Sequence, residues 1–139
     1  MDEWLAGTGK YEPRFITPQV KQLDPGETHI ILDSYNPVDI RYLYLDVSGA
    51  GADNTVLTIT SDTFYFSFSM SEMMNYNIHS LIRDIPSLIL ADPTNSHYIV
   101  MFKPIPPLHS NHRVIVRVEN PSTDSVRITY AFGYSEEVE

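Results

Sequence analysis

Histidines are the residues of this chain whose spacing comes nearest to that of a metal site. His109 and His112 are close in the sequence, so one loop could present both imidazoles to a single ion. A zinc site needs further protein ligands, and none is identifiable in a chain without cysteine. The simpler interpretation is a solvated loop. We therefore predict no metal at these histidines and no cofactor for the chain.

Two short acidic loops are candidates for a structural calcium ion, because Ca²⁺ prefers oxygen ligands. They are residues 52–54 (ADN) and 91–95 (ADPTN). Neither has the ligand spacing of an EF-hand loop, and Asp and Asn are common in turns for their bonds to nearby backbone. We interpret both as ordinary turns, with a bound ion as the alternative.

The sequence contains none of the local motifs that organise a catalytic centre. It lacks a glycine-rich phosphate loop, a G-x-S-x-G nucleophile motif and an H-E-x-x-H metal motif. Sugar hydrolysis would need two carboxylates that face each other across a cleft. Most of the candidate aspartates lie at expected strand ends beside turns, and nothing selects a pair. They are Asp33, Asp39, Asp46, Asp62 and Asp84.

We therefore predict that the chain is not an enzyme. The alternative is a catalytic site assembled from distant strands, which would leave no local motif in the sequence.

The charge balance argues against nucleic acid and membranes as partners. The formal net charge is −9 at pH 7, and the nine Lys and Arg residues are scattered. Arg113, Arg117 and Arg127 could meet across one hairpin as a small basic stripe, although ordinary solvent-exposed charges explain them as well. No apolar run approaches the ~20 residues that span a bilayer. The opening MDEWLAGTG has no features of a secretory signal, so we expect synthesis in the cytoplasm without export.

Residues that favour β-strands dominate the composition. Val, Ile, Thr, Tyr, Phe and Trp make up 49 of the 139 residues. Short alternating segments are separated by turn signals such as Asp24-Pro25-Gly26 and Asn36-Pro37. The strands are expected at residues 15–23, 28–33, 38–47, 55–60, 63–70, 88–91, 97–103, 113–119 and 126–134. The last two strands flank the turn-rich segment 120–125 and are predicted to form a hairpin.

One segment breaks this β pattern. In residues 71–85, apolar side chains recur at helical spacing, and Ser69 followed by Glu72 fits a capping box. We predict a short helix whose Met73 and Met74 fill the core.

Together the elements predict an all-β protein. We expect an antiparallel β-sandwich, jelly-roll-like, with one short helix and an extended N-terminal arm; a barrel is the alternative. The length fits one domain, residues 15–135, preceded by the arm, residues 1–14, and followed by a solvated acidic tail, residues 136–139.

The strand expected at residues 38–47 is apolar on both faces. One face carries Val38, Ile40, Tyr42 and Tyr44, and the other carries Arg41, Leu43, Leu45 and Val47. Such a strand is covered on both sides, or one face meets a partner. Together with Tyr65, these tyrosines are also candidates for the exposed aromatic platform of a carbohydrate-binding module.

The N-terminal arm carries the only Trp of the chain. We predict that Trp4, Leu5, Tyr11 and Phe15 anchor the arm on a neighbouring subunit, since large apolar side chains are the usual anchors of interfaces. The alternative is that Trp4 caps the core of its own domain.

Three segments carry a resemblance to a known class of proteins. They are the arm MDEWLAGTGKYEPR, the turn LDPGET at residues 23–28, and the closing segment RVIVRVENPSTDSVRITYAFGY at residues 113–134. In architecture they resemble the small β-sandwich accessory proteins of tailed-bacteriophage virions, such as capsid cement or decoration proteins and adaptors. The resemblance implies a non-enzymatic virion protein that self-associates, commonly as a trimer, and docks on another virion protein such as the major capsid protein. A carbohydrate-binding module for host recognition is the alternative function.

Overall fold

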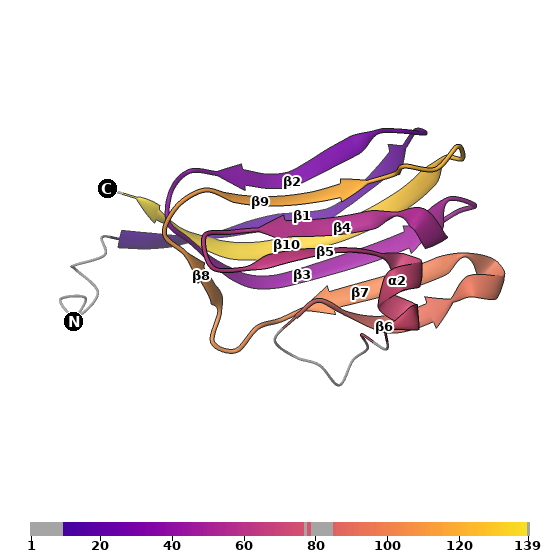
Figure 1. Cartoon of the computed structure of the whole chain (residues 1–139). Coiled ribbons are helices and arrows are strands. Elements are labelled where there is room, and N and C mark those ends of the chain that lie inside the picture. Colours follow the sequence, from indigo (N-terminus) through magenta and orange to yellow (C-terminus); the bar gives the residue numbers. More distant parts are fainter. Residues whose placement is uncertain (1–9, 77, 79–84, 139) are drawn as a thin grey trace.

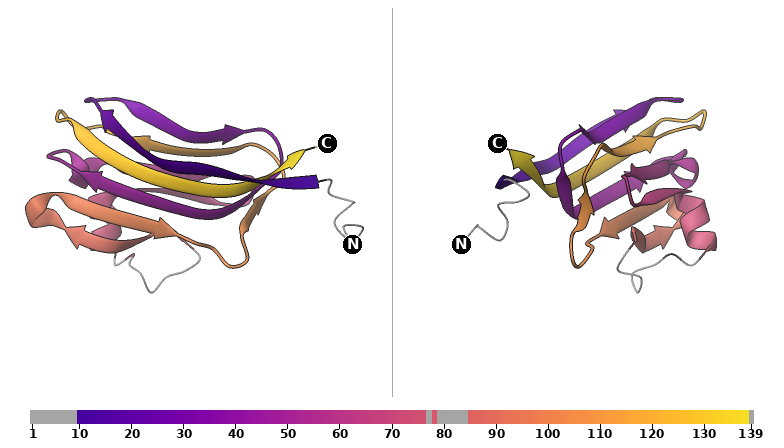
Figure 2. Two further views of the ribbon diagram at one scale, coloured as in Figure 1. Left: turned by 180° about the vertical axis from the view of Figure 1, so that it is seen from behind. Right: turned by 60° about the vertical axis from the view of Figure 1, so that its left-hand side comes forward.

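Two antiparallel β-sheets packed face to face make up the protein (Figure 1, Figure 2). The computed structural model describes residues 10–76, 78 and 85–138. The six-stranded sheet follows the order β1 (Lys10–Leu23), β10 (Val126–Val138), β3 (Val38–Ser48), β7 (His97–Phe102) and β6 (Ser87–Asp92), and β8 (Leu108–Ser110) pairs with β3. The four-stranded sheet follows the order β2 (Thr28–Ser34), β9 (Val114–Glu119), β4 (Val56–Thr60) and β5 (Tyr65–Ser69).

The all-β sandwich predicted from the sequence is confirmed. The chain passes repeatedly from one sheet to the other, as in a jelly roll. Successive side chains of a strand point to opposite faces, so every second residue enters the space between the sheets. Leu43 and Leu45 of β3 and Val116 and Val118 of β9 are fully buried there in one core cluster.

The predicted hairpin of the last two long strands is wrong. Strand β9 pairs with β2 and β4, whereas β10 pairs with β1 and β3 in the other sheet. The inward residues of the two strands therefore face each other across the core rather than side by side. The basic stripe is absent for the same reason, because Arg113 and Arg117 belong to the β9 side of the sandwich and Arg127 belongs to β10.

The helix begins where the capping box predicts and ends early. Helix α2 (Met70–Asn75) has Ser69 as its N-cap, with the Ser69 side chain and Glu72 bonded reciprocally to each other's backbone. Met73 is fully buried and Met74 is partly buried, so the pair does fill the core. The rest of the predicted helix falls mostly on residues 77 and 79–84, which lie outside the described part of the chain.

Strand β1 begins five residues before the expected one, since residues 10–14 of the predicted arm pair with the end of β10. An irregularity between Ile16 and Gln19 divides it. Leu23 is the only residue of 11–23 that is buried, and Phe15 is 63% exposed. The strand is thus attached mainly through its backbone ladder.

Residues 136–138 of the expected solvated tail are instead a continuation of strand β10. The carboxylate of Glu136 accepts hydrogen bonds from the Ser34 hydroxyl at 2.9 Å and the Asn36 amide at 3.2 Å. It also lies 3.6 Å from the Arg14 guanidinium. These three donors and the pairing with β1 hold residues 136–138 in the sheet.

Candidate functional site

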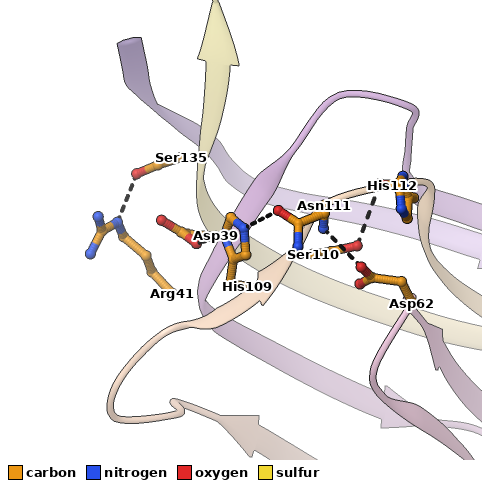
Figure 3. Close-up of polar contacts among 8 residues, drawn as sticks. All are labelled: Asp39, Arg41, Asp62, His109, Ser110, Asn111, His112 and Ser135. Atoms are coloured by element: carbon orange, nitrogen blue, oxygen red, sulfur yellow. Dashed lines mark hydrogen bonds and ion pairs between the residues drawn. The ribbon is translucent and has the colours of Figure 1, made fainter. Parts of the chain in front are cut away.

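A polar cluster around His109 closes one end of the sandwich (Figure 3). His109 of β8 pairs across the ladder with Asp39 of β3, and its Nδ1 lies 2.6 Å from the Asp39 Oδ1. Its Nε2 lies 2.7 Å from the Asn111 Oδ1. Both partners are oxygen acceptors, so this arrangement suits the imidazolium, which donates from both ring nitrogens.

The cluster joins both sheets. The Asn111 backbone N–H donates to the Asp62 Oδ2 at 3.2 Å, and Asp62 belongs to the β4–β5 turn of the four-stranded sheet. In the six-stranded sheet, Arg41 Nε donates to the Ser135 Oγ at 2.8 Å, which links β3 to β10 (Figure 3). These contacts therefore connect the two sheets, and strands β3 and β10, at this end of the sandwich.

This arrangement does not provide a general base or a metal ligand. Both ring nitrogens of His109 are engaged, and a base or ligand needs a free lone pair. The predicted partner His112 is exposed, and its contact in the cluster is a backbone carbonyl that accepts from Ser110 at 3.4 Å. Within residues 10–76, 78 and 85–138, no three His, Asp or Glu side chains are grouped as metal ligands.

The His109 cluster predicts a pH dependence of stability. Burial lowers the pKa of His109, but the hydrogen bonds to Asp39 and Asn111 and the charges of Asp39 and Asp62 outweigh it, so the pKa is raised. A raised folded pKa stabilises the fold below the unfolded value of about 6.5, and the effect fades as the pH rises through the folded value.

We expect His109→Gln to lower the melting temperature at about pH 5.5 more than at about pH 8.5, measured by circular dichroism. His112→Gln is the matched control, and its effect should be small at both pH values. An equal loss for His109→Gln at both pH values would contradict the role of the imidazolium.

The other candidate carboxylates have structural partners. Asp33 binds the Arg113 guanidinium through both oxygens, at 3.0 and 2.9 Å, which lowers its pKa. Asp46 lies 2.9 Å from the Nε2 of His97. Asp84 lies outside the described residues. Asp33 and Asp46 are thus each engaged by a basic side chain.

The two loops considered for calcium are built as turns. Asp53 accepts a hydrogen bond from the hydroxyl of the buried Tyr98 at 2.5 Å. Asp92 caps the turn η2 (Pro93–Asn95) by accepting from the Asn95 backbone at 3.3 Å and from its side-chain amide at 2.8 Å. Protein donors thus occupy both carboxylates, Tyr98 of β7 at Asp53 and Asn95 of the same loop at Asp92.

The outer face of the six-stranded sheet is apolar over most of its width, and we call it the outer apolar face. Cross-strand register places its members in adjacent rows, because directly paired residues share a face. The members are Phe15 and Val20 on β1, Ala131 and Gly133 on β10, Tyr42 and Tyr44 on β3, Ile99 and Met101 on β7, and Leu90 on β6.

Gly133 is required on this face by a close contact with an aromatic ring. A Cβ at Gly133 would lie 2.2 Å from the Cε1 of Tyr42, so the ring lies directly over the glycine. Phe15 pairs with Gly133 from the other side. The predicted anchor Phe15 therefore shares one row with Tyr42, which the sequence had already placed opposite the core.

The outer face of the four-stranded sheet is mixed, and the 52% exposed Ile30 pairs there with Arg117. Arg117 pairs with Thr58, and the Thr58 and Ser67 hydroxyls are 3.0 Å apart. Tyr65, 72% exposed, belongs to this sheet. The three tyrosines considered as a glycan platform are therefore divided between the two sheets.

The predicted anchors are only partly brought together. Tyr11 lies beside His109, with ring centroids 6.3 Å apart, and Phe15 lies on the outer apolar face. Trp4 and Leu5 lie outside the described residues. Sequence reasoning missed Gly133, Met101 and Leu90, whose membership of this face depends on which strands are neighbours.

Among the described residues, no helix has the length and apolarity needed to cross a membrane. Comparison of the chain with protein-family models and with curated proteins found no match.

Proposed function

We propose that this chain is a non-enzymatic structural protein of a virus particle, a capsid cement or decoration protein or an adaptor. In this proposal it stabilises the assembly by self-association through the outer apolar face and by its N-terminal arm. The trimer and the docking on another virion protein come from the resemblance of the arm, the first turn and the closing strands to phage accessory proteins.

The contrast between the two outer faces carries the proposal. Apolar side chains lie on five strands of one sheet, with Thr129 and Asp46 interrupting one of their rows, whereas Arg117, Thr58 and Ser67 lie on the other sheet. At ~4.8 Å between strands and ~3.3 Å per residue, the apolar rows cover on the order of 400 Å². A stable interface buries about 800 Å² per partner, so this face supplies about half of that area.

We expect the arm to supply part of the remainder. Residues 1–9 precede β1, whose first residues pair with the end of β10 beyond the last pairs of β3. Burial of Trp4 on a neighbour would remove about 150–250 Å² from water. Arm and face together approach the area of a stable interface.

Association through the outer apolar face also fits the edge that β1 presents. Pro13 and Pro18 lie in β1, and proline cannot donate to a further ladder. Natural sheets use edge prolines to prevent strand addition. A second copy therefore packs on the face of this sheet rather than extending it at β1.

Light scattering coupled to size-exclusion chromatography tests the proposal on the full chain and on a chain lacking residues 1–9. We expect an oligomer for the full chain and weaker association for the shortened chain, which keeps β1 intact. Far-ultraviolet circular dichroism should be the same for both. A full chain that stays monomeric at high concentration would contradict self-association, and identical association of both chains would contradict the role of the arm.

The viral assignment has a separate test. Mass spectrometry of purified particles of the virus that encodes the chain should find it in a fixed ratio to a capsid or tail protein. Its absence from the particles would contradict the assignment without bearing on self-association.

A further inference from the structure

A polar hollow lies at the loop end of the outer face of the six-stranded sheet, where Thr129 and Asp46 interrupt the last apolar row. It is a shallow, open depression of about 390 Å³, and every lining residue is polar. The lining residues are Asp46, Ser48, Asn95, His97, Arg127 and Thr129. The cross-strand pairing explains this hollow. The short side chain of Ser48 lies between its two direct partners, Arg127 on β10 and His97 on β7, whose side chains are longer.

We infer that this hollow binds a neutral saccharide. The walls offer donors and acceptors together: the Arg127 guanidinium and the Ser48 and Thr129 hydroxyls can donate, and the Asp46 carboxylate can accept. Each hydroxyl of a sugar both donates and accepts, so a mixed wall of this kind suits it. An anion would suit only the donors and would be repelled by Asp46.

The free donor of the hollow is Arg127. In the described part of the chain, no ion pair or side-chain hydrogen bond occupies its guanidinium. An arginine in this position offers several N–H groups in a fixed plane, which suits two neighbouring hydroxyls of one ring.

The other walls are held in place before a ligand arrives. The Nε2 of His97 lies 2.9 Å from the Asp46 Oδ1, and the Asn95 amide donates to Asp92 at 2.8 Å. Four of the lining residues belong to strands: Arg127, Thr129, Asp46 and His97. Groups fixed in this way lose little freedom on binding, which favours affinity.

The surroundings provide length. A second hollow of about 230 Å³ adjoins the first and shares Ser48 and Arg127 with it. Two adjoining hollows favour an oligosaccharide over a single sugar.

A glycan array probed with the full chain tests the inference, followed by calorimetric titration of the best-bound neutral oligosaccharide. We expect Arg127→Ala and Asp46→Asn each to weaken binding at least about tenfold, as for the loss of a hydrogen bond to a charged group. The matched control is Arg117→Ala, which removes an arginine from the four-stranded sheet and should leave the affinity unchanged. Melting temperatures of all variants establish that each is folded.

Three results would overturn the inference. They are no neutral glycan above background, neutral binding unaffected by both hollow variants, and binding of acidic glycans only, which would make the hollow an anion site. Light scattering on Arg127→Ala distinguishes a failure of this inference from a failure of the proposed self-association. Arg127 lies outside the apolar rows, so its replacement should leave the oligomer unchanged.

Discussion

Replacement of Asn120 by alanine is expected to lower the free energy of unfolding by about 3 kcal/mol. Asn120 is fully buried at the end of β9. Its amide nitrogen donates to the carbonyls of Leu23 at 3.2 Å, Asp24 at 3.3 Å and Asp124 at 2.7 Å. Its amide oxygen accepts from the backbone and the hydroxyl of Ser122, at 3.1 and 2.7 Å.

The size of the effect follows from what alanine would leave behind. Each buried polar group that loses its partner costs about 1–3 kcal/mol, and several groups lose theirs together. The backbone of Asn120 also pairs with the β1–β2 turn, through Gly26 at 2.7 Å and Glu27 at 2.9 Å. The turn and the loop between the sheets should therefore loosen as one unit.

Urea denaturation followed by circular dichroism, at one fixed protein concentration, measures the loss. The isosteric Asn120→Asp should cost at least as much as alanine, because it keeps the acceptor for Ser122 but turns a second oxygen toward three carbonyls. The exposed Asn54→Ala is the control and should change stability by less than about 0.5 kcal/mol. A loss below about 1 kcal/mol in both Asn120 variants would refute this role.

Replacement of Tyr44 by glutamate is expected to weaken self-association by about 30-fold or more, the cost of removing an interface residue worth about 2 kcal/mol. Tyr44 lies in the middle of the outer apolar face, paired with Ala131 of β10 and Met101 of β7. A carboxylate there would be buried without a partner when two copies pack together. The fold itself should be retained, because the core residues of β3 are its neighbours Leu43 and Leu45.

Sedimentation velocity over a range of concentrations measures the change. Tyr65→Glu is the matched control: it makes the same substitution at an exposed position of the four-stranded sheet and adds the same charge to a chain of net charge −9. Equal dissociation of both variants would indicate general repulsion and contradict the assignment of the interface to this face. Unchanged association of Tyr44→Glu would contradict it as well.

The candidate surface was only half visible in the sequence. Alternation along residues 38–47 placed Tyr42 and Tyr44 opposite the core, and the structure agrees. It also placed Val38 and Ile40 with the tyrosines, which is wrong: both are buried in the core, because the extra residue Arg41 at the register shift breaks the alternation. The ring of Tyr42 over Gly133 and the pairing of Tyr44 with Met101 join residues that are far apart in the chain. No local pattern encodes these neighbours, and the same holds for the hollow between Arg127 and His97.

By itself the sequence determined the β-sandwich class, the positions of most strands, the inward sides of the strands that became β9 and β10, and the N-cap of the helix at Ser69. These features depend on period-2 alternation, turn residues and a capping box, which act over a few residues. The tertiary structure alone decided which strands are neighbours. The alternation of β9 and β10 suits a hairpin as well as two facing sheets, and the buried contacts of Asn120 with Leu23 and Asp24, nearly a hundred residues away, are made in the second arrangement.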